Sequence, residues 1–248
     1  MTGGIAAIFR HPIKGHGRES LVDAVLTPGQ GLPWDRHWAV AHDAARLGPG
    51  WNACHNFARG AKAPGLMAIE SQLDPETATV TLRHPDRGEL VFRPDDPADL
   101  PRFLDWVRPL NPPDRAQPVQ IVSADRALTD SAFPSISLFS LASCRDLEAR
   151  MGVPLSPHRW RGNLWIGGVQ PFEEFSWVGR RLRIYKVELE VVERIGRCKA
   201  TSANPETGVI DADTLGGLQA HYGHTEFGVY ARVVTGGEIR LEDEVEVL

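Results

Sequence analysis

Cys198 lies among cationic side chains in the stretch ERIGRCKATSANPETG, residues 193–208. Arg194, Arg197 and Lys199 flank it, and nearby positive charge favours the thiolate, the form of cysteine that attacks substrates and binds metals. A lone cysteine is also a small apolar residue that is often buried in a core. The residues around Cys198 therefore leave two interpretations open: a reactive or metal-binding thiol, and a core residue.

Further basic side chains lie where predicted strands end or begin. Lys14 follows a buried strand over residues 4–10, because Pro12 ends the sheet pairing and leaves the lysine at the end of the strand. Asp35 and Arg36 directly precede another strand, although a charged pair at such a place is also typical of a solvated loop.

Arg161 and Asn163 belong to the run HRWRGNLWIGG, residues 158–168. If this run is a strand, the two polar side chains share one face, because side chains alternate. Gly162 between them weakens a strand and indicates that something packs close to the backbone. The polar pair therefore faces either a cavity, which the glycine favours, or the outer surface.

A hydroxyl-rich segment, residues 130–137, precedes a helix predicted over residues 138–151. Ser137 or Ser140 can cap that helix. A run of hydroxyls that includes Ser135 and Ser137, next to the amides of a helix N-terminus, could equally hold an anion.

The three cysteines form no CxxC pair, so the sequence indicates neither a disulfide framework nor a four-ligand zinc site. Cys144 recurs with apolar residues at helical spacing and is expected to be buried. Cys54 and His55 lie in a long predicted loop, residues 44–64, where adjacent side chains make a poor chelating pair.

The composition excludes some classes of partner. The 248 residues carry 27 Lys and Arg against 32 Asp and Glu, a net charge of -5, which gives no reason to expect nucleic acid or an anionic membrane. The N-terminus lacks the cationic start and apolar core of a signal peptide, and no run approaches the roughly 20 apolar residues of a spanning helix. We expect a cytoplasmic protein.

Periodicity and turn residues predict a β-rich barrel with helical additions. Strands are predicted over residues 4–10, 20–26, 66–73, 79–83, 89–92, 118–123, 181–184 and 187–192, with a final hairpin over 227–248, and helices over 97–110, 138–151 and 213–221. The Pro- and Asp-rich piece 109–118 predicts a boundary between two halves, residues 1–112 and 113–248, that share a cleft.

The motifs, taken in order, resemble a known family. The sequence contains HPIKG, GLPWDRHWAV, WRGNLWIGG, PFEEFSW, IGRCKATSANPETGVIDAD and GVYARVVTGGEIRLEDEVEVL. This series resembles the MOSC family, named after the C-terminal domain of molybdenum cofactor sulfurase. It is most similar to members in which that domain follows a smaller N-terminal β-barrel, as in the mitochondrial amidoxime-reducing component and its bacterial relatives. The resemblance implies an N-terminal β-barrel domain over residues 1–112 and a MOSC-type β-barrel over 113–248.

The resemblance also implies a cofactor and the residues that bind it. In the family, the cysteine that matches Cys198 ligates molybdenum held by molybdopterin, whose phosphate needs cations and amides. By similarity, the cofactor-binding residues are Lys14, Arg36, Ser135, Ser137, Arg161, Asn163 and Arg197. Members often have a serine where this chain has Gly15, which implies that one hydrogen bond to the cofactor comes from backbone. A family-level association with pyridoxal phosphate assigns no residue of this chain.

The function that the resemblance implies is reduction of small N-hydroxylated compounds at the molybdenum cofactor. The sequence ends at Leu248 without a four-cysteine iron–sulfur module, so we expect electrons from a separate ferredoxin, flavoprotein or cytochrome. Two alternatives stay open: a sulfur carrier that delivers sulfur from a Cys198 persulfide, and a non-catalytic carrier of the cofactor.

Overall fold

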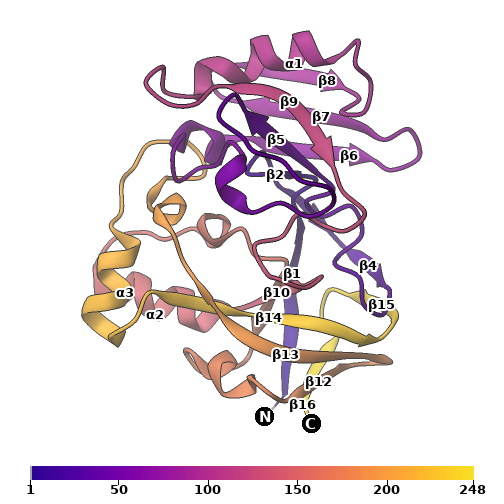
Figure 1. Cartoon of the computed structure of the whole chain (residues 1–248). Helices are drawn as coiled ribbons and strands as arrows, with labels where there is room; N and C mark the ends of the chain where they lie inside the picture. Colours follow the sequence, from indigo (N-terminus) through magenta and orange to yellow (C-terminus); the bar gives the residue numbers. More distant parts are fainter. Residues whose placement is uncertain (1) are drawn as a thin grey trace.

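Seven strands close into a barrel, which forms the lower part of Figure 1. The computed structural model describes residues 2–248. The barrel strands are β1 (Thr2–Arg10), β10 (Ile136–Ser140), β11 (Leu164–Gly167), β12 (Arg181–Ile184), β13 (Val187–Gly196), β14 (Glu226–Thr235) and β16 (Glu244–Val247). Their order is β11-β10-β14-β13-β12-β16-β1, and β1 pairs back with β11, which closes the ring.

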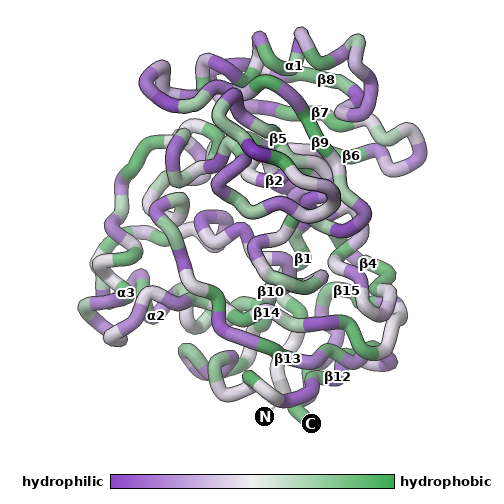
Figure 2. Tube along the Cα trace, in the orientation of Figure 1, coloured by the Kyte–Doolittle hydropathy of each residue, from purple (hydrophilic) through white to green (hydrophobic). Residues whose placement is uncertain are grey.

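Alternate residues of the strands fill the barrel. In β13, Val187, Leu189 and Val191 are buried and the residues between them are partly exposed, as the period of two in the sequence predicted. Figure 2 shows hydrophobic and hydrophilic segments following each other along the barrel strands. The barrel is therefore a packed core, and a binding site must lie at its rim.

A smaller unit packs against one end of the barrel, at the top of Figure 1. Its sheets are β2 (Ile13–Lys14), β5 (Trp38–His42) and β9 (Pro118–Ser123), and β6 (Glu70–Asp74), β7 (Thr79–His84) and β8 (Gly88–Phe92), with helix α1 (Leu100–Val107). Trp38, Phe92 and Phe103 belong to its apolar core. The predicted fold class is confirmed: the chain is mainly β, with a barrel packed against a smaller N-terminal β unit.

Short elements complete the fold. β3 (Glu19–Leu21) pairs with β1, and β4 (Asp23–Leu26) pairs with β15 (Gly237–Arg240). Helices α2 (Leu141–Met151) and α3 (Thr214–Tyr222) lie together beside the barrel in Figure 1. The 3-10 helices are η1 (Cys54–Asn56), η2 (Pro64–Ala68), η3 (Arg108–Leu110), η4 (Pro157–Trp160), η5 (Glu173–Trp177) and η6 (Lys199–Ser202). Within residues 2–248, every helix is too short or too polar to cross a membrane.

Strand pairing joins the two halves of the sequence in both directions. The first strand, β1, is a member of the barrel that the second half builds, and β9, from the second half, pairs with β5. The division into residues 1–112 and 113–248 stays a prediction, and in space the two units exchange strands across it.

Several predicted elements differ from the structure, among them the three that follow. The final hairpin over 227–248 is wrong: Gly236 brings the backbone so close to Leu26 that an added Cβ would lie 2.6 Å from its carbonyl oxygen, and β15 pairs with β4 instead. Residues 64–68 form η2 rather than the start of a strand, because a short buried apolar run fits either state. Helix α2 begins at Leu141, where the Ser140 hydroxyl accepts hydrogen bonds from the amides of Ala142 and Ser143.

An aromatic cluster supports the rim of the barrel beneath the site. The ring of Phe139 stacks on Trp165 at 5.1 Å between centroids, and Trp160 stacks on Phe227 at 3.8 Å. Gly162 explains how closely the chain passes: an added Cβ would lie 2.3 Å from Cδ2 of Phe139. The close approach to backbone that this glycine predicted is therefore confirmed, and the neighbour is Phe139.

We expect Gly162→Ala to lower the free energy of unfolding by about 1–3 kcal/mol, because overpacking forces the Phe139 ring or the backbone to move. The control is Gly48→Ala, since an added Cβ at Gly48 meets no atom within 4 Å. Urea unfolding of both variants measures the difference. Equal stability of the two variants would contradict this account of the packing.

Candidate functional site

A cavity of about 280 Å³ lies where the barrel meets the N-terminal unit. Both units contribute to its walls, since Lys14 comes from β2 and Cys198 follows β13. Its lining residues are Lys14, Gly15, Arg36, Cys54, Arg59, Gly60, Ala61, Met67, Asp130, Ser137, Trp160, Arg161, Gly196, Arg197, Cys198, Ala200 and Tyr230. The predicted shared cleft is thus present, and it brings together Cys198 and cations that are far apart in the sequence.

Cys198 is exposed at this cavity, so the interpretation as a core residue is wrong. It lies two residues after the end of β13 and directly precedes η6. Its carbonyl oxygen accepts hydrogen bonds from the amide and the hydroxyl of Thr201, and the Thr201 hydroxyl lies 2.6 Å from that of Thr214 in α3. The strand and α3 therefore fix the backbone that carries the thiol.

Arg36 and Arg197 are held by two successive carbonyl groups at the end of η4. Nη2 of Arg36 donates to the carbonyl of Arg161 at 2.8 Å, and Nη2 of Arg197 donates to the carbonyl of Trp160 at 2.6 Å. These contacts leave other guanidinium N–H groups available. Within residues 2–248, the buried Nε of Arg197 makes no hydrogen bond.

Arg161 takes the left-handed backbone conformation, with φ of 50°, and ends η4. The run 158–168 is therefore a strand only from Leu164, where β11 begins, and the alternation considered for Arg161 and Asn163 does not apply. Its buried Nη2 has no hydrogen-bond partner in residues 2–248. Burial and the nearby charge of Arg36 lower the pKa of Arg161 to about 9, which shows how poorly this cation is solvated.

Asp35 holds the side chain of Arg36 in place. Its buried carboxylate contacts Nη1 of Arg36 and accepts a hydrogen bond from the amide of His11 at 2.8 Å. Burial alone would raise the pKa of Asp35, but Arg36 and the bond from His11 hold it well below its usual range. Burial, and then the charge of Arg161, lower the pKa of His11 to about 3. The Asp35–Arg36 pair is therefore a buried support of the cavity and not a solvated loop pair.

Lys14 is buried and donates to the carbonyl of Leu128 at 2.6 Å and to Oδ1 of Asp130 at 2.5 Å. Burial lowers the pKa of Lys14, although Asp130 acts in the opposite direction. Gly15, next to it, has φ of 77°, and an added Cβ would lie 2.7 Å from the carbonyl oxygen of Ala58. A serine at this position would therefore be strained.

Ser137 and Asn163 connect neighbouring elements. The Ser137 hydroxyl donates to Oδ1 of Asn163 at 2.8 Å, and Nδ2 of Asn163 donates to the carbonyl of Phe9 in β1 at 3.2 Å. Ser137 lines the cavity, whereas the buried Asn163 lies behind it and positions β10, β11 and β1. Ser135 does not line the cavity, because its hydroxyl is 2.7 Å from that of Ser131 in a buried cluster.

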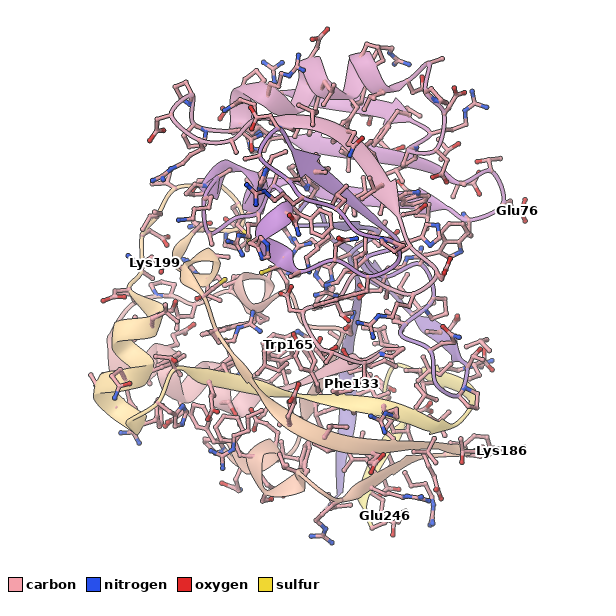
Figure 3. The ribbon with its side chains drawn as sticks, in the orientation of Figure 1. Glu76, Phe133, Trp165, Lys186, Lys199 and Glu246 are labelled. Carbon is pink, nitrogen blue, oxygen red and sulfur yellow. The ribbon has the colours of Figure 1, made fainter. Side chains whose placement is uncertain are left out.

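Two cations that flank Cys198 in the sequence lie outside the cavity. Arg194 pairs with Glu226 at 3.4 Å and lies over the ring of Phe175, so it points to another face of β13. Lys199 is exposed where the two units meet (Figure 3) and is not a lining residue. Arg197 is the flanking cation that reaches the cavity.

Several lining residues were not predicted from the sequence. Cys54 accepts a contact of 2.7 Å from Nη1 of Arg59, and both line the same cavity as Cys198. Asp130 and Tyr230 also face it. Asp130 had a weak signal, as the acidic first residue of the hydroxyl-rich segment, whereas Tyr230 had none because it reads as part of an ordinary strand.

The cations and the thiol of the cavity suit a ligand that carries both negative charge and a thiophilic metal. Lys14, Arg36, Arg161 and Arg197 gather desolvated positive charge, and two buried guanidinium nitrogens lack a partner in the described chain. Buried unpaired donors are costly, so a ligand that accepts their hydrogen bonds would be favoured. A thiol beside this charge can ligate a thiophilic metal or act as a nucleophile.

Family comparisons agree with the fold. Residues 2–104 match the MOSC N-terminal β-barrel domain, and residues 125–246 match the MOSC domain. The chain therefore belongs to the MOSC family, among the members that combine these two domains. MOSC domains are associated with binding of the molybdenum cofactor in this family.

Similar proteins include mitochondrial amidoxime-reducing component 1 of Danio rerio, 26% identical over 84% of this chain and 71% of that protein. The same component of Homo sapiens is 30% identical over 63% of this chain, and component 2 of Bos taurus is 30% identical over 46%. These two matches span less than half of the mammalian proteins, 49% and 38%. The YUAD protein of Bacillus subtilis aligns with a TM-score of 0.48 and 14% identity, covering 100% of this chain and 96% of that one.

Buried neutral histidines give the fold a pH dependence that can be measured. Burial lowers the pKa of His16 to about 4 from 6.5, and a depressed pKa of this kind adds stability above the unfolded pKa that is lost as the pH falls. Between pH 7 and pH 5, we expect the wild type to lose about 2 kcal/mol more unfolding free energy than His16→Gln. Urea unfolding at both pH values tests this, with the exposed His221→Gln as control. Parallel losses in wild type and His16→Gln would refute it.

Proposed function

We propose that the cavity binds a molybdenum–pterin cofactor that carries a phosphate, with Cys198 as the protein ligand of the metal. The single observation that carries this proposal is the cavity that joins an exposed thiol to five cationic side chains from both units. Two of these cations hold buried N–H groups without a partner in residues 2–248. A phosphate would accept hydrogen bonds from these N–H groups, and a thiophilic metal would bind the thiol of Cys198.

The residues have distinct proposed roles. Lys14, Arg36 and Arg161 would hold the anionic part of the cofactor, and Arg197 would lie near the metal. Ser137 would add a hydroxyl at the wall. Asn163 and Ser135 would act indirectly, because they support the strands and the loop that present the other residues. The thiolate of Cys198 would supply the soft ligand that a high-valent metal–sulfur site prefers.

As activity, we propose reduction of N-hydroxylated compounds with electrons from a separate ferredoxin, flavoprotein or cytochrome. The bound cofactor supplies two-electron chemistry at a metal centre, which no side chain here can supply. The names of the relatives, amidoxime-reducing components, support this substrate class. The chain's own part is to fix the cofactor, to surround the reacting group with charge and to admit the substrate at the exposed side of Cys198.

The exposure of Cys198 supports a second candidate function, that of a sulfur carrier. An exposed cysteine can accept sulfane sulfur from a donor persulfide, hold it as a persulfide and pass the outer sulfur to a thiol or a cofactor precursor. A carrier that stores the cofactor without turnover is a further alternative. Intact-protein mass spectrometry distinguishes a sulfur carrier from the cofactor-binding alternatives, because a persulfide adds about 32 Da to an otherwise metal-free protein.

We expect Cys198→Ser to abolish molybdenum retention in protein produced by a host that makes the cofactor. The reason is that serine cannot replace a soft thiolate ligand, while its exposed position leaves the fold intact. Metal content by mass spectrometry and the melting temperature are measured together.

Two other thiols make this experiment specific. Cys54→Ser removes the second thiol of the cavity, and Cys144→Ser removes a buried thiol whose pKa is raised by burial to about 11. Both variants are expected to retain molybdenum. Retention in Cys198→Ser, or loss in Cys54→Ser instead, would contradict the assignment of the ligand.

Arg161→Gln is expected to have opposite effects on binding and on stability. The variant should release pterin about 10- to 100-fold more readily, because a charge-assisted contact to phosphate is lost. Without cofactor it should melt at a higher temperature than the wild type, because a buried, poorly solvated charge is gone. The control is Arg194→Gln, which lies outside the cavity on another face of β13. A fall in both properties would mean that Arg161 is structural.

A further inference from the structure

One carboxylate stands among the cations of the cavity. Among the lining residues, Asp130 is the acidic one, beside five lysine and arginine side chains, Lys14, Arg36, Arg59, Arg161 and Arg197. The carboxylate neutralises Lys14, but its negative charge also opposes an anionic cofactor, since like charges repel. Asp130 therefore needs an explanation beyond cofactor binding.

The carboxylate is anchored at one oxygen and open at the other. Oδ1 accepts the hydrogen bond from Lys14 at 2.5 Å, and Lys14 is itself fixed by the carbonyl of Leu128. Within residues 2–248, Oδ2 of Asp130 makes no hydrogen bond, and the side chain is 58% exposed although Lys14 is only 7% exposed. The pair thus presents a fixed carboxylate oxygen to whatever enters from solvent.

This carboxylate stays ionised at neutral pH. Its desolvation alone would raise the pKa of Asp130, but the charges of Lys14, Arg36 and Arg197 hold that pKa below its usual value. An ionised carboxylate accepts hydrogen bonds and does not donate them. A general acid is therefore a poor description of Asp130, whereas a receptor for N–H groups or for positive charge suits it.

We propose that Asp130 determines substrate specificity by accepting the N–H groups of amidine-type substrates, such as amidoximes and N-hydroxyguanidines. This inference rests on the proposed reductase function. It divides the N-hydroxylated compounds by their products. Compounds of the first class give amidines or guanidines, and compounds of the second class, such as hydroxamic acids, give neutral products.

The chemistry of the two classes explains the selection. Reduction of an amidoxime breaks the N–O bond, consumes two electrons from the external donor and two protons from solvent, and releases water. The amidine that remains takes up a further proton and becomes a cation with parallel N–H donors. A hydroxamic acid consumes the same electrons and protons but leaves a neutral amide. A carboxylate therefore interacts more strongly with the first class, and increasingly so as positive charge develops.

The variant Asp130→Asn tests the proposal, because the amide keeps the shape and an acceptor oxygen for Lys14 but removes the charge. Asp125→Asn is the matched control: Asp125 lies five residues earlier in the same loop and lines a different cavity. Molybdenum and pterin content are measured first, so that the proteins compared carry equal cofactor.

Two measurements on the loaded proteins follow. Calorimetry compares benzamidine, a cation, with benzamide, its neutral counterpart. Steady-state kinetics with a chemical reductant compares benzamidoxime with benzohydroxamic acid. In Asp130→Asn we expect benzamidine to bind about 10- to 100-fold more weakly, and kcat/KM to fall by a similar factor for benzamidoxime alone. Asp125→Asn should match the wild type in all four values.

The possible failures can be distinguished. An equal fall for both substrates, or unchanged benzamidine affinity in Asp130→Asn, would overturn the role of Asp130. Loss of cofactor in Asp130→Asn would equally overturn it, since the carboxylate would then only position Lys14. If the wild type reduces neither substrate, the proposed reductase function fails, and the benzamidine comparison still decides whether Asp130 is a cation receptor.

Discussion

The site depends on the hydrogen bonds that the turn at Trp160 and Arg161 accepts from two arginine side chains. Its two carbonyl groups accept Arg197 from the barrel and Arg36 from the N-terminal unit. Carbonyl groups at the end of a helical turn are free to accept such bonds and carry partial negative charge. The same turn places the side chain of Arg161 in the cavity. One short segment therefore sets the relative position of three guanidinium groups that the sequence keeps far apart.

These cations are only partly neutralised by the protein. Asp35 balances Arg36 and Asp130 balances Lys14, whereas Arg161 and Arg197 have no ion pair within residues 2–248. Holding such charges out of water reduces stability, and the depressed pKa of Arg161 expresses that cost. Binding an anion would recover it. The site is thus arranged to be less stable alone than with a ligand, which is the usual relation between function and stability at binding sites.

The sequence predicts much of the fold because local patterns survive into the structure. The alternation in β13 and the helical spacing around Cys144 required no knowledge of the rest of the chain. The pairing partners of strands were harder to predict, since the sequence around Gly236 indicates a hairpin turn unless the position of β4 is known. The cavity residues likewise could be predicted where the signal is local and could not where it depends on a distant neighbour. Cys198 and its motif could be predicted, whereas Asp130 became a candidate only when its neighbour Lys14, 116 residues away, was located beside it.

The N-terminal unit does more than cover the cavity. Nη1 of Arg18 donates to the carbonyl of Pro205 at 3.1 Å, and an added Cβ at Gly208 would lie 2.7 Å from Cα of Gly65. Both contacts fix the segment that follows Cys198 against the other unit. A barrel that lost them would keep its own apolar core, which lies within the ring of strands. It would lose the wall that holds Lys14 and the support of the loop behind the thiol. The chemistry therefore belongs to the junction of the two units, and neither contains a complete site.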